Sequence, residues 1–115
     1  LRANGPLNVK ENMADVGGIN LAYDALMTYL NEHPDENVDI DGMTPAQRCF
    51  VSWAQMWTFK ATEQYVRNQV NGDNHAPGNY RAVAALQHVD AFYEAFDIRE
   101  GDPMWLSPER RVNAW

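Results

Sequence analysis

Apolar residues recur at helical rather than alternating spacing along most of the chain, and clusters of glycine and proline separate the apolar segments. This pattern predicts an all-α, mainly helical fold without strands or internal repeats. The first predicted helix begins near Asn8 as its N-cap, with Glu11 three residues later, and Pro34 ends it. Its inward positions run from Met13 to Leu30.

The second predicted helix has a clear start, because Thr44 is a good N-cap and Pro45 suits the first helical position. We expect it to reach about Lys60. Its apolar positions are more numerous than a surface helix needs, so we expect it to be largely buried. These positions are Phe50, Val51, Trp53, Ala54, Met56 and Trp57.

Three shorter helical segments are predicted after it, over residues 63–70, 80–87 and 90–96, with a loop at 71–78. Their inward side chains are expected to be Ala82, Val83, Leu86, Val89, Phe92, Tyr93 and Phe96. From Gly101 the chain is expected to be irregular. It should pack through Met104, Trp105, Leu106 and Trp115.

A chain of 115 residues suits a single domain or segment, residues 1–115. Its formal net charge of −7 repels a phosphate backbone, so we expect no nucleic-acid partner. The single cysteine, Cys49, cannot form an internal disulfide, and no apolar run is long enough to span a bilayer. Because the chain begins at Leu1 without an initiator Met, we expect it to be processed or cut from a longer protein.

Two carboxylates on the first helix are candidates for chemistry. Glu11 and Asp15 lie four residues apart and share a face, with no Lys or Arg at positions 7, 8, 18 or 19 to neutralise them. Either both are solvated, or a positive group from elsewhere lies between them. The following pair, Gly17 and Gly18, costs about 2 kcal/mol relative to alanines. It indicates close approach of another backbone or a kink.

The loop before the fourth predicted helix concentrates a second group of candidates. Asp73 is placed to hold one imidazole nitrogen of His75, and Arg81 could bind a carbonyl or carboxylate with its planar fork. An ordinary solvated turn is the alternative interpretation. His33 and His88 lack comparable neighbours and are interpreted as structural or surface residues.

Two motifs in these regions resemble the neprilysin and endothelin-converting-enzyme family of zinc metallopeptidases. Residues 11–18, Glu-Asn-Met-Ala-Asp-Val-Gly-Gly, resemble that family's ENxADxGG motif, and residues 75–81, His-Ala-Pro-Gly-Asn-Tyr-Arg, resemble its H-x-P-G-x-[FY]-R segment. Residues 54–57 resemble the intervening AQxW stretch, and the chain ends in Trp115 as family members do. The resemblance covers essentially the whole chain. It implies the C-terminal part of the thermolysin-like catalytic domain of a gluzincin.

The resemblance also implies a role for each candidate residue. Glu11 matches the third protein ligand of a catalytic Zn²⁺, and Asp15 matches the carboxylate that orients a ligand histidine. His75 matches the donor to the oxyanion, with Asp73 as its acidic partner. Arg81 matches the arginine that binds a peptide carbonyl beyond the scissile bond. Met56 and Trp57 match positions that line the pocket for the residue after the cut, although their spacing alone is typical of core.

One family motif is missing. No HExxH occurs, so the two histidine ligands and the glutamate that activates water must come from an upstream part of the same enzyme. We therefore expect this segment alone to be inactive and to bind zinc negligibly, with one Zn²⁺ in the full-length enzyme. Position 58 is Thr and no cysteine follows Cys49, a pattern that resembles bacterial members without disulfides.

The resulting prediction is part of a zinc metalloendopeptidase that cleaves oligopeptides on the amino side of hydrophobic residues. Family resemblance implies an extracytoplasmic location. Apolar surface meant for the upstream half could make the segment self-associate, which size-exclusion chromatography would test. Two alternatives stay open. One is a non-catalytic helical interaction module on the same scaffold, and the other is an enzyme that uses Glu11, Asp15 and His75 as a metal-free acid and base set.

Overall fold

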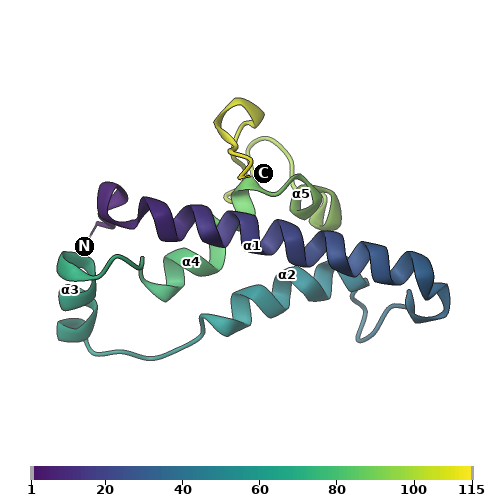
Figure 1. The fold of residues 1–115 in the computed structure, drawn as a ribbon, viewed down its shortest axis with the longest axis horizontal. Coiled ribbons are helices and arrows are strands. Elements are labelled where there is room, and N and C mark those ends of the chain that lie inside the picture. Colours follow the sequence, from purple (N-terminus) through teal and green to yellow (C-terminus); the bar gives the residue numbers. More distant parts are fainter. Residues whose placement is uncertain (1, 115) are drawn as a thin grey trace.

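The computed structural model describes residues 2–114, which form helices joined by irregular segments (Figure 1). Within that range the only β-type pairing is one isolated bridge between Ile40 and Met43. The all-α prediction is therefore confirmed. The elements are α1 (Gly5–Glu32), η1 (Pro34–Glu36), α2 (Pro45–Met56), α3 (Glu63–Gly72), α4 (Gly78–Ala84), η2 (Leu86–His88), α5 (Asp90–Phe96) and η3 (Pro108–Arg110), where η marks a 3₁₀ helix.

Helix α1 begins earlier than predicted. Asn4 is its N-cap and accepts a hydrogen bond from the Leu7 N–H at 3.3 Å, while Pro6 occupies the first turn. The prediction that Asn8 caps this helix is wrong, because Asn8 is a buried helical residue whose amide group bonds to a distant loop. The helix ends at Glu32, just before Pro34, as predicted.

Helix α2 begins as predicted but ends sooner. Thr44 and Gln47 form a capping box, in which each side chain accepts from the backbone N–H of the other. The Trp57 N–H bonds to the Ala54 carbonyl three residues back, which tightens the last turn and ends the helix at Met56 rather than near Lys60. The predicted burial of the apolar face is wrong for this chain, since Phe50 is buried but several other members of the face are only partly covered.

The second half follows the predicted order with adjusted boundaries. Helix α3 begins at the predicted residue and extends two residues further, and α5 has the predicted bounds. The segment predicted as one helix over residues 80–87 is divided into α4, which starts at Gly78, and η2. Of the side chains predicted to face inward, Val83 and Phe96 are exposed, because no other part of residues 2–114 covers them.

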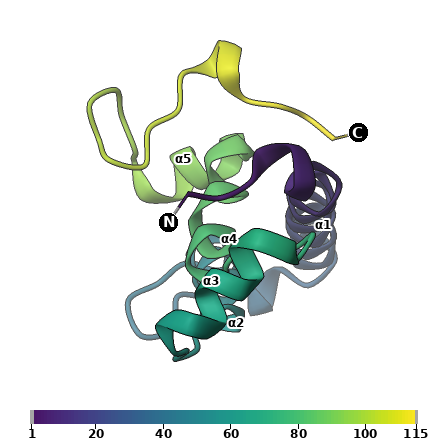
Figure 2. The same cartoon turned by 90° about the vertical axis from the view of Figure 1, so that its left-hand side faces the viewer.

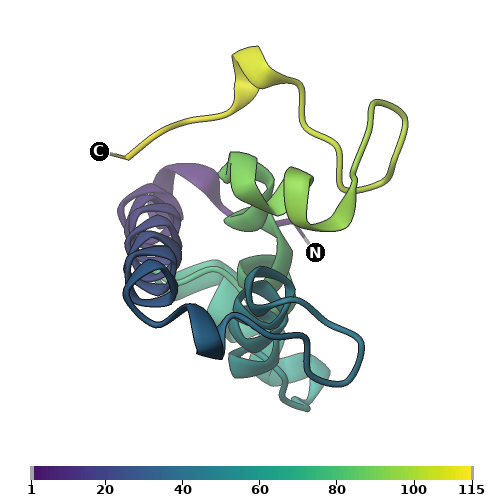
Figure 3. The same ribbon diagram turned by 90° about the vertical axis from the view of Figure 1, so that its right-hand side faces the viewer.

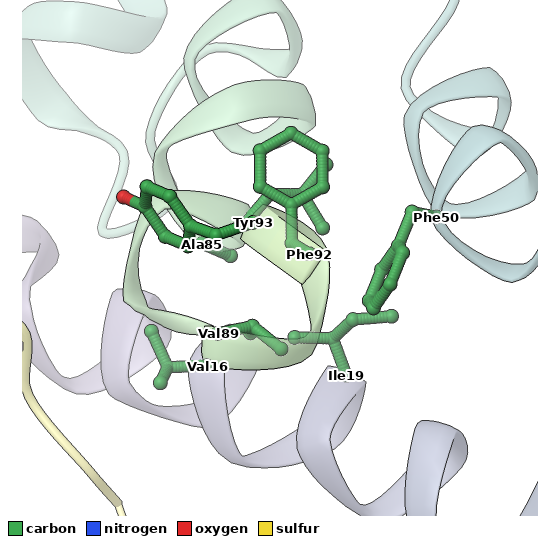
Figure 4. Close-up of a cluster of buried hydrophobic side chains, with 8 residues drawn as sticks. Val16, Ile19, Phe50, Ala85, Val89, Phe92 and Tyr93 are labelled. Carbon is green, nitrogen blue, oxygen red and sulfur yellow. The ribbon is translucent and has the colours of Figure 1, made fainter. Parts of the chain in front are cut away.

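The core lies where α1, α2, η2 and α5 meet (Figure 4). Phe50 stacks on Tyr23 of α1 and meets Phe92 edge to face, with ring centroids 5.4 and 5.6 Å apart. The buried members of this cluster are Val16, Ile19, Phe50, Ala85, Leu86, Val89, Phe92 and Tyr93. They join the middle of α1 to α2, η2 and α5.

The C-terminal segment, residues 101–114, arches over α5 on the side away from α2 (Figures 2 and 3). Met104 and Trp105 pack against the core, as predicted, and the Tyr93 hydroxyl accepts from the Leu106 N–H at 3.1 Å. The Arg111 guanidinium lies 3.6 Å from the Tyr93 ring centroid. Trp115, which was also predicted to pack here, lies outside the described residues.

The shape is elongated, with extents of 48 × 32 × 27 Å and a Cα radius of gyration of 15.6 Å. An independent domain of about 100 residues has a radius near 13 Å. Large apolar side chains stay exposed on most elements, including Val9, Leu21, Ile40, Met56, Phe59 and Tyr65. This surface is typical of a segment that packs against further polypeptide. No helix within residues 2–114 has the length and apolar character needed to cross a membrane.

Close backbone approach occurs at Gly78, while the proposal of close approach at the Gly17 and Gly18 pair is not supported at Gly18 and stays a prediction at the buried Gly17. A side chain at Gly18 would meet nothing within 4 Å, and α1 runs through Gly17 and Gly18 without interruption. A Cβ at Gly78 would instead lie 2.9 Å from the Trp57 carbonyl oxygen and overlap the Phe59 ring. Gly78 is therefore the glycine that allows α4 to lie against the end of α2.

Candidate functional site

His75 lies between two carboxylates. Its Nδ1 is 2.9 Å from Asp73 Oδ1, and its Nε2 is 3.2 Å from Glu11 Oε2 on α1. The Asp73 oxygen also accepts from the His75 backbone N–H at 2.8 Å. The backbone bond first, and then the side-chain bond, lower the Asp73 pKa below its usual value. Asp73 thus stays ionised and fixes the orientation of the imidazole, as the sequence predicted.

A buried residue of α1 holds the loop that carries His75. The Asn8 side chain donates to the Asp73 carbonyl oxygen at 3.1 Å, and Asn8 is almost fully buried. Because Asn8 is three residues before Glu11, it lies on the same face of α1. Sequence reasoning missed this role by assigning Asn8 to the helix cap. The signal available in the sequence was that Asn8 is a polar residue on the same helix face as Glu11.

Asp15 and Arg81 form a two-bond ion pair between α1 and α4. Arg81 Nε donates to Asp15 Oδ2 at 2.7 Å, and Arg81 Nη2 donates to Asp15 Oδ1 at 2.6 Å. The Arg81 side chain is only 15% exposed and the Asp15 side chain 8%, and the bond to Asp15 raises the Arg81 pKa above its usual value. Of the two interpretations of the acidic pair on α1, solvation is excluded for Asp15, whose positive partner comes from the second motif.

Arg81 also joins the carboxylate to the aromatic end of α2. Its guanidinium carbon lies 3.9 Å from the Trp57 ring centroid, and the Trp53 indole N–H donates to the Arg81 carbonyl at 3.1 Å. The pair uses Nε and Nη2, so the Nη1 donors of Arg81 stay outside it. The predicted substrate-binding residues Arg81 and Trp57 are therefore in contact.

The fold brings most of the candidates together. Glu11, Asp73 and His75 form one connected group, while Asp15, Arg81 and Trp57 form a second one turn further along α1. Met56 is 66% exposed at the end of α2, so this chain does not enclose it. Within residues 2–114, neither of the two other histidines bonds to these groups, although His88 lines the same cavity as Asp15 and Arg81. His33 is exposed and stacks on Tyr29, and His88 is half-buried and bonds to the C-terminal segment.

The metal-binding side chains of residues 2–114 suit a zinc site that takes its other ligands from outside the segment, rather than a complete site. Within residues 2–114, no three His, Cys, Asp or Glu side chains are grouped so as to hold a metal ion. A catalytic Zn²⁺ needs three protein ligands. The Glu11 carboxylate is one-third exposed, and its only close partner in this range is His75, so it can accept a ligand from outside the segment. The residues therefore fit the contribution of one ligand.

Breaking the Asp15–Arg81 pair by removing one partner should strongly destabilise the protein. Replacing Arg81 by Met should destabilise the protein by about 3 kcal/mol, because it leaves a buried carboxylate without a partner. The double variant Asp15→Asn with Arg81→Met should recover part of this loss. Urea unfolding followed by tryptophan fluorescence measures both. Arg99→Met is the matched control, since Arg99 and Asp97 form a similar pair with side chains 76% exposed and should matter little. Equal effects of the two single substitutions would contradict the prediction.

Comparison with known proteins relates this arrangement to a family. The model of peptidase family M13 matches residues 1–112. The chain is 35% identical over 113 residues to a neutral endopeptidase of Lactococcus lactis subsp. lactis, which covers 98% of this chain and 16% of that protein. It is 32% identical over 114 residues to human neprilysin, which covers 97% of this chain and 15% of neprilysin.

A solved structure matches the fold as well. The crystal structure of the Mycobacterium tuberculosis zinc metalloprotease ZMP1 in complex with an inhibitor superimposes with a TM-score of 0.91 at 37% identity, over 97% of this chain and 17% of that one. The resemblance to the neprilysin family is thus confirmed. The chain spans about one sixth of the length of the relatives that it matches.

Proposed function

Since the chain belongs to peptidase family M13, we propose that it is the C-terminal part of the thermolysin-like catalytic domain of a zinc-dependent metalloendopeptidase. The observation that carries this proposal is the meeting of two distant motifs, in which Glu11 approaches His75 and Asp15 binds Arg81 across 66 positions of the sequence. An HExxH segment, supplied by the part of the enzyme outside this chain, completes the site.

In this proposal Glu11 holds the metal together with two histidines from outside the segment. Bound zinc supplies a Lewis acid and makes water nucleophilic near neutral pH. Asp15 keeps one ligand histidine in position. Both of its oxygens already accept from Arg81, but carboxylate oxygens retain further lone pairs for an imidazole N–H.

The remaining residues act on the substrate. His75, held by Asp73, donates a hydrogen bond to the oxyanion that forms when water adds to the peptide carbonyl. The Nη1 donors of Arg81 bind a carbonyl of the substrate beyond the scissile bond. Trp57 supports the guanidinium and, with Met56, lines the pocket for an apolar side chain after the cut. Exposure of Met56 in this chain supports a pocket whose other wall comes from the upstream part.

The expected substrates are oligopeptides, cleaved on the amino side of hydrophobic residues, and the expected location is extracytoplasmic. The segment without its upstream partner is proposed to be inactive. Its exposed apolar side chains support packing against that partner, or self-association when the partner is missing.

Metal removal tests the proposal. Exhaustive chelation of the full-length enzyme should abolish peptide hydrolysis, and one equivalent of Zn²⁺ should restore it. Undiminished hydrolysis after chelation would favour the metal-free acid and base enzyme instead. A parent sequence without HExxH, together with absence of hydrolysis, would favour the non-catalytic interaction module.

A further inference from the structure

Asn8 is a buried polar residue in a part of α1 where the apolar residues beside it are exposed. Asn8 is 3% exposed, whereas Leu7 and Val9 on either side of it face solvent. Burial of an amide side chain costs free energy unless the amide is hydrogen-bonded. An apolar residue would suit a buried helix position better, so the value of Asn8 lies in the group that it binds.

The amide of Asn8 begins a chain of contacts that leads to the imidazole of His75. Its Nδ2 donates to the Asp73 carbonyl oxygen at 3.1 Å, and the carboxylate of the same Asp73 lies 2.9 Å from His75 Nδ1. The other ring nitrogen of His75 lies 3.2 Å from Glu11. The contacts therefore form a closed ring that starts and ends on α1, with the imidazole held between Asp73 and Glu11.

The bond made by Asn8 extends the contacts of the candidate site by one turn of α1. Three polar residues of this helix, spaced three and then four positions apart, share one face and meet the region of the second motif. The pairs are Asn8 with Asp73, Glu11 with His75, and Asp15 with Arg81. The proposed function gives roles to the second and third pairs and leaves the first without one.

Close packing of side chains does not fix the His75 loop against the start of α1. A groove of about 570 Å³ lies between Leu7 and the facing residues, which include Gln69 and Asp73. The loop is tied to α3 in another way, since the Asp73 N–H donates to the Gln69 carbonyl at 2.9 Å, and Ala76 is buried. The loop therefore stays folded without Asn8, and the Asn8 bond sets where it lies relative to α1.

We propose that Asn8 is a positioning residue for His75, and that its bond to the Asp73 carbonyl sets the distance between the imidazole and Glu11. This inference rests on the proposed function, in which His75 donates to the oxyanion and Glu11 is a zinc ligand. A displacement of about 1 Å at a reacting group can lower a rate about 10²-fold. Asn8 acts through Asp73 and His75 and has no contact of its own with substrate.

Two substitutions of Asn8 remove the hydrogen bond in different ways. Leu in Asn8→Leu has a similar size and branching but no donor. Asp in Asn8→Asp has nearly the same shape and presents an acceptor to the Asp73 carbonyl, so it repels the loop. Asn20→Leu is the matched control, because Asn20 is a partly buried residue of the same helix whose amide donates to the Val16 carbonyl at 2.8 Å, within α1.

The first test is kinetic and uses the full-length enzyme on a peptide. Asn8→Leu should lower kcat about 10-fold or more, and Asn8→Asp should lower it further, because the imidazole is displaced from the reacting carbonyl. KM should stay within about twofold and a full equivalent of zinc should be retained, since neither the metal ligand nor the substrate contacts are changed. Asn20→Leu should leave kcat, KM and zinc content unchanged.

A double substitution separates positioning of His75 from a general structural role. In a His75→Phe background, Asn8→Leu should cause no further loss of kcat, because the group through which Asn8 acts has been removed. A residue that only supported the fold would lower kcat by the same factor with and without His75. If Asn8→Leu does not fold, Asn8→Ala takes its place, since the smaller side chain lets water bond to the Asp73 carbonyl.

The second test measures geometry without substrate or metal. Crystal structures of the metal-free full-length wild type and of Asn8→Leu should differ in the distance from His75 Nε2 to Glu11 by roughly 0.5 Å or more, the tolerance of a catalytic arrangement. The Asp15–Arg81 pair, one turn further along α1, should keep its two hydrogen bonds and serves as the internal reference.

Four results would overturn the proposal. They are an unchanged kcat in Asn8→Leu, an equal further loss in the His75→Phe background, loss of zinc from Asn8→Leu, and an unchanged distance between His75 and Glu11. Failure of the proposed peptidase function shows differently, because the wild type would then hydrolyse peptides after chelation or not at all. The distance in the metal-free protein does not depend on that outcome.

Discussion

Replacing Glu11 by Ala in the full-length enzyme should remove zinc and, with it, peptide hydrolysis. Glu11 is the only candidate metal ligand that this segment supplies in the proposed site, and its carboxylate is exposed enough to meet ligands from outside. Substitution of residues that merely orient a ligand weakens metal affinity 10- to 100-fold. Loss of a ligand itself should weaken zinc binding by about 100-fold or more. Zinc content after dialysis and kcat/KM on a peptide measure the effect.

The structure also allows a second role for Glu11, and the zinc content of the same variant distinguishes the two roles. Because Glu11 lies 3.2 Å from His75, it could serve only to position that imidazole. In that case Glu11→Ala would keep a full equivalent of zinc while activity fell. Glu32→Ala, at the exposed end of the same helix, is the matched control and should retain both zinc and activity.

Replacing His75 by Phe should lower peptide hydrolysis without removing zinc. The variant should retain zinc, because His75 is not a ligand in the proposed site, but kcat/KM should fall about 10²- to 10³-fold. This corresponds to about 3 kcal/mol of lost transition-state stabilisation, the magnitude found when one oxyanion donor is removed. Phe keeps a ring of similar shape and removes both ring nitrogens. Zinc content and kinetics on the same peptide measure the result.

The environment of His75 supports this expectation and supplies a graded variant. Asp73 holds Nδ1 at 2.9 Å, so Nε2 is the nitrogen directed toward Glu11 and the adjoining space. Asp73→Asn should lower activity less than His75→Phe, since it weakens the orientation but keeps the ring. His33→Phe is the control, because His33 is exposed and stacks on Tyr29. A His75 variant that bound little zinc would show that the assigned role is wrong.

Local signals explain which parts of the fold could be predicted. Thr44 with Pro45 and Thr62 before Glu63 mark helix starts through bonds that span three residues, and both starts are where the pattern placed them. At Asn8 the same reasoning was wrong, because the sequence has two asparagines near the helix start, Asn4 and Asn8, and local chemistry suits either as a cap. Burial of Asn8 against the loop at Asp73 decided between them, and that contact spans 65 positions.

The candidate site, too, could be predicted from the sequence only in part. The motifs around Glu11 and His75 identified the family, but the spacing of Glu11 and Asp15 left open whether both are solvated or meet a positive group from elsewhere. The sequence did not reveal that Arg81 is the partner of Asp15, or that His75 approaches Glu11. Nor did it show that Met56, Val83 and Phe96 stay exposed, since exposure depends on what packs over a helix and not on the helix pattern itself.

By itself the sequence determined the helical class, most helix starts and the family, because these depend on residues within a few positions of one another and on the identity of short motifs. Only the tertiary structure decided which carboxylate meets which cation, which glycine allows close packing and what Asn8 holds. Those outcomes depend on distances between segments brought together when α1, α4 and the C-terminal segment pack, and such distances are not encoded in local spacing.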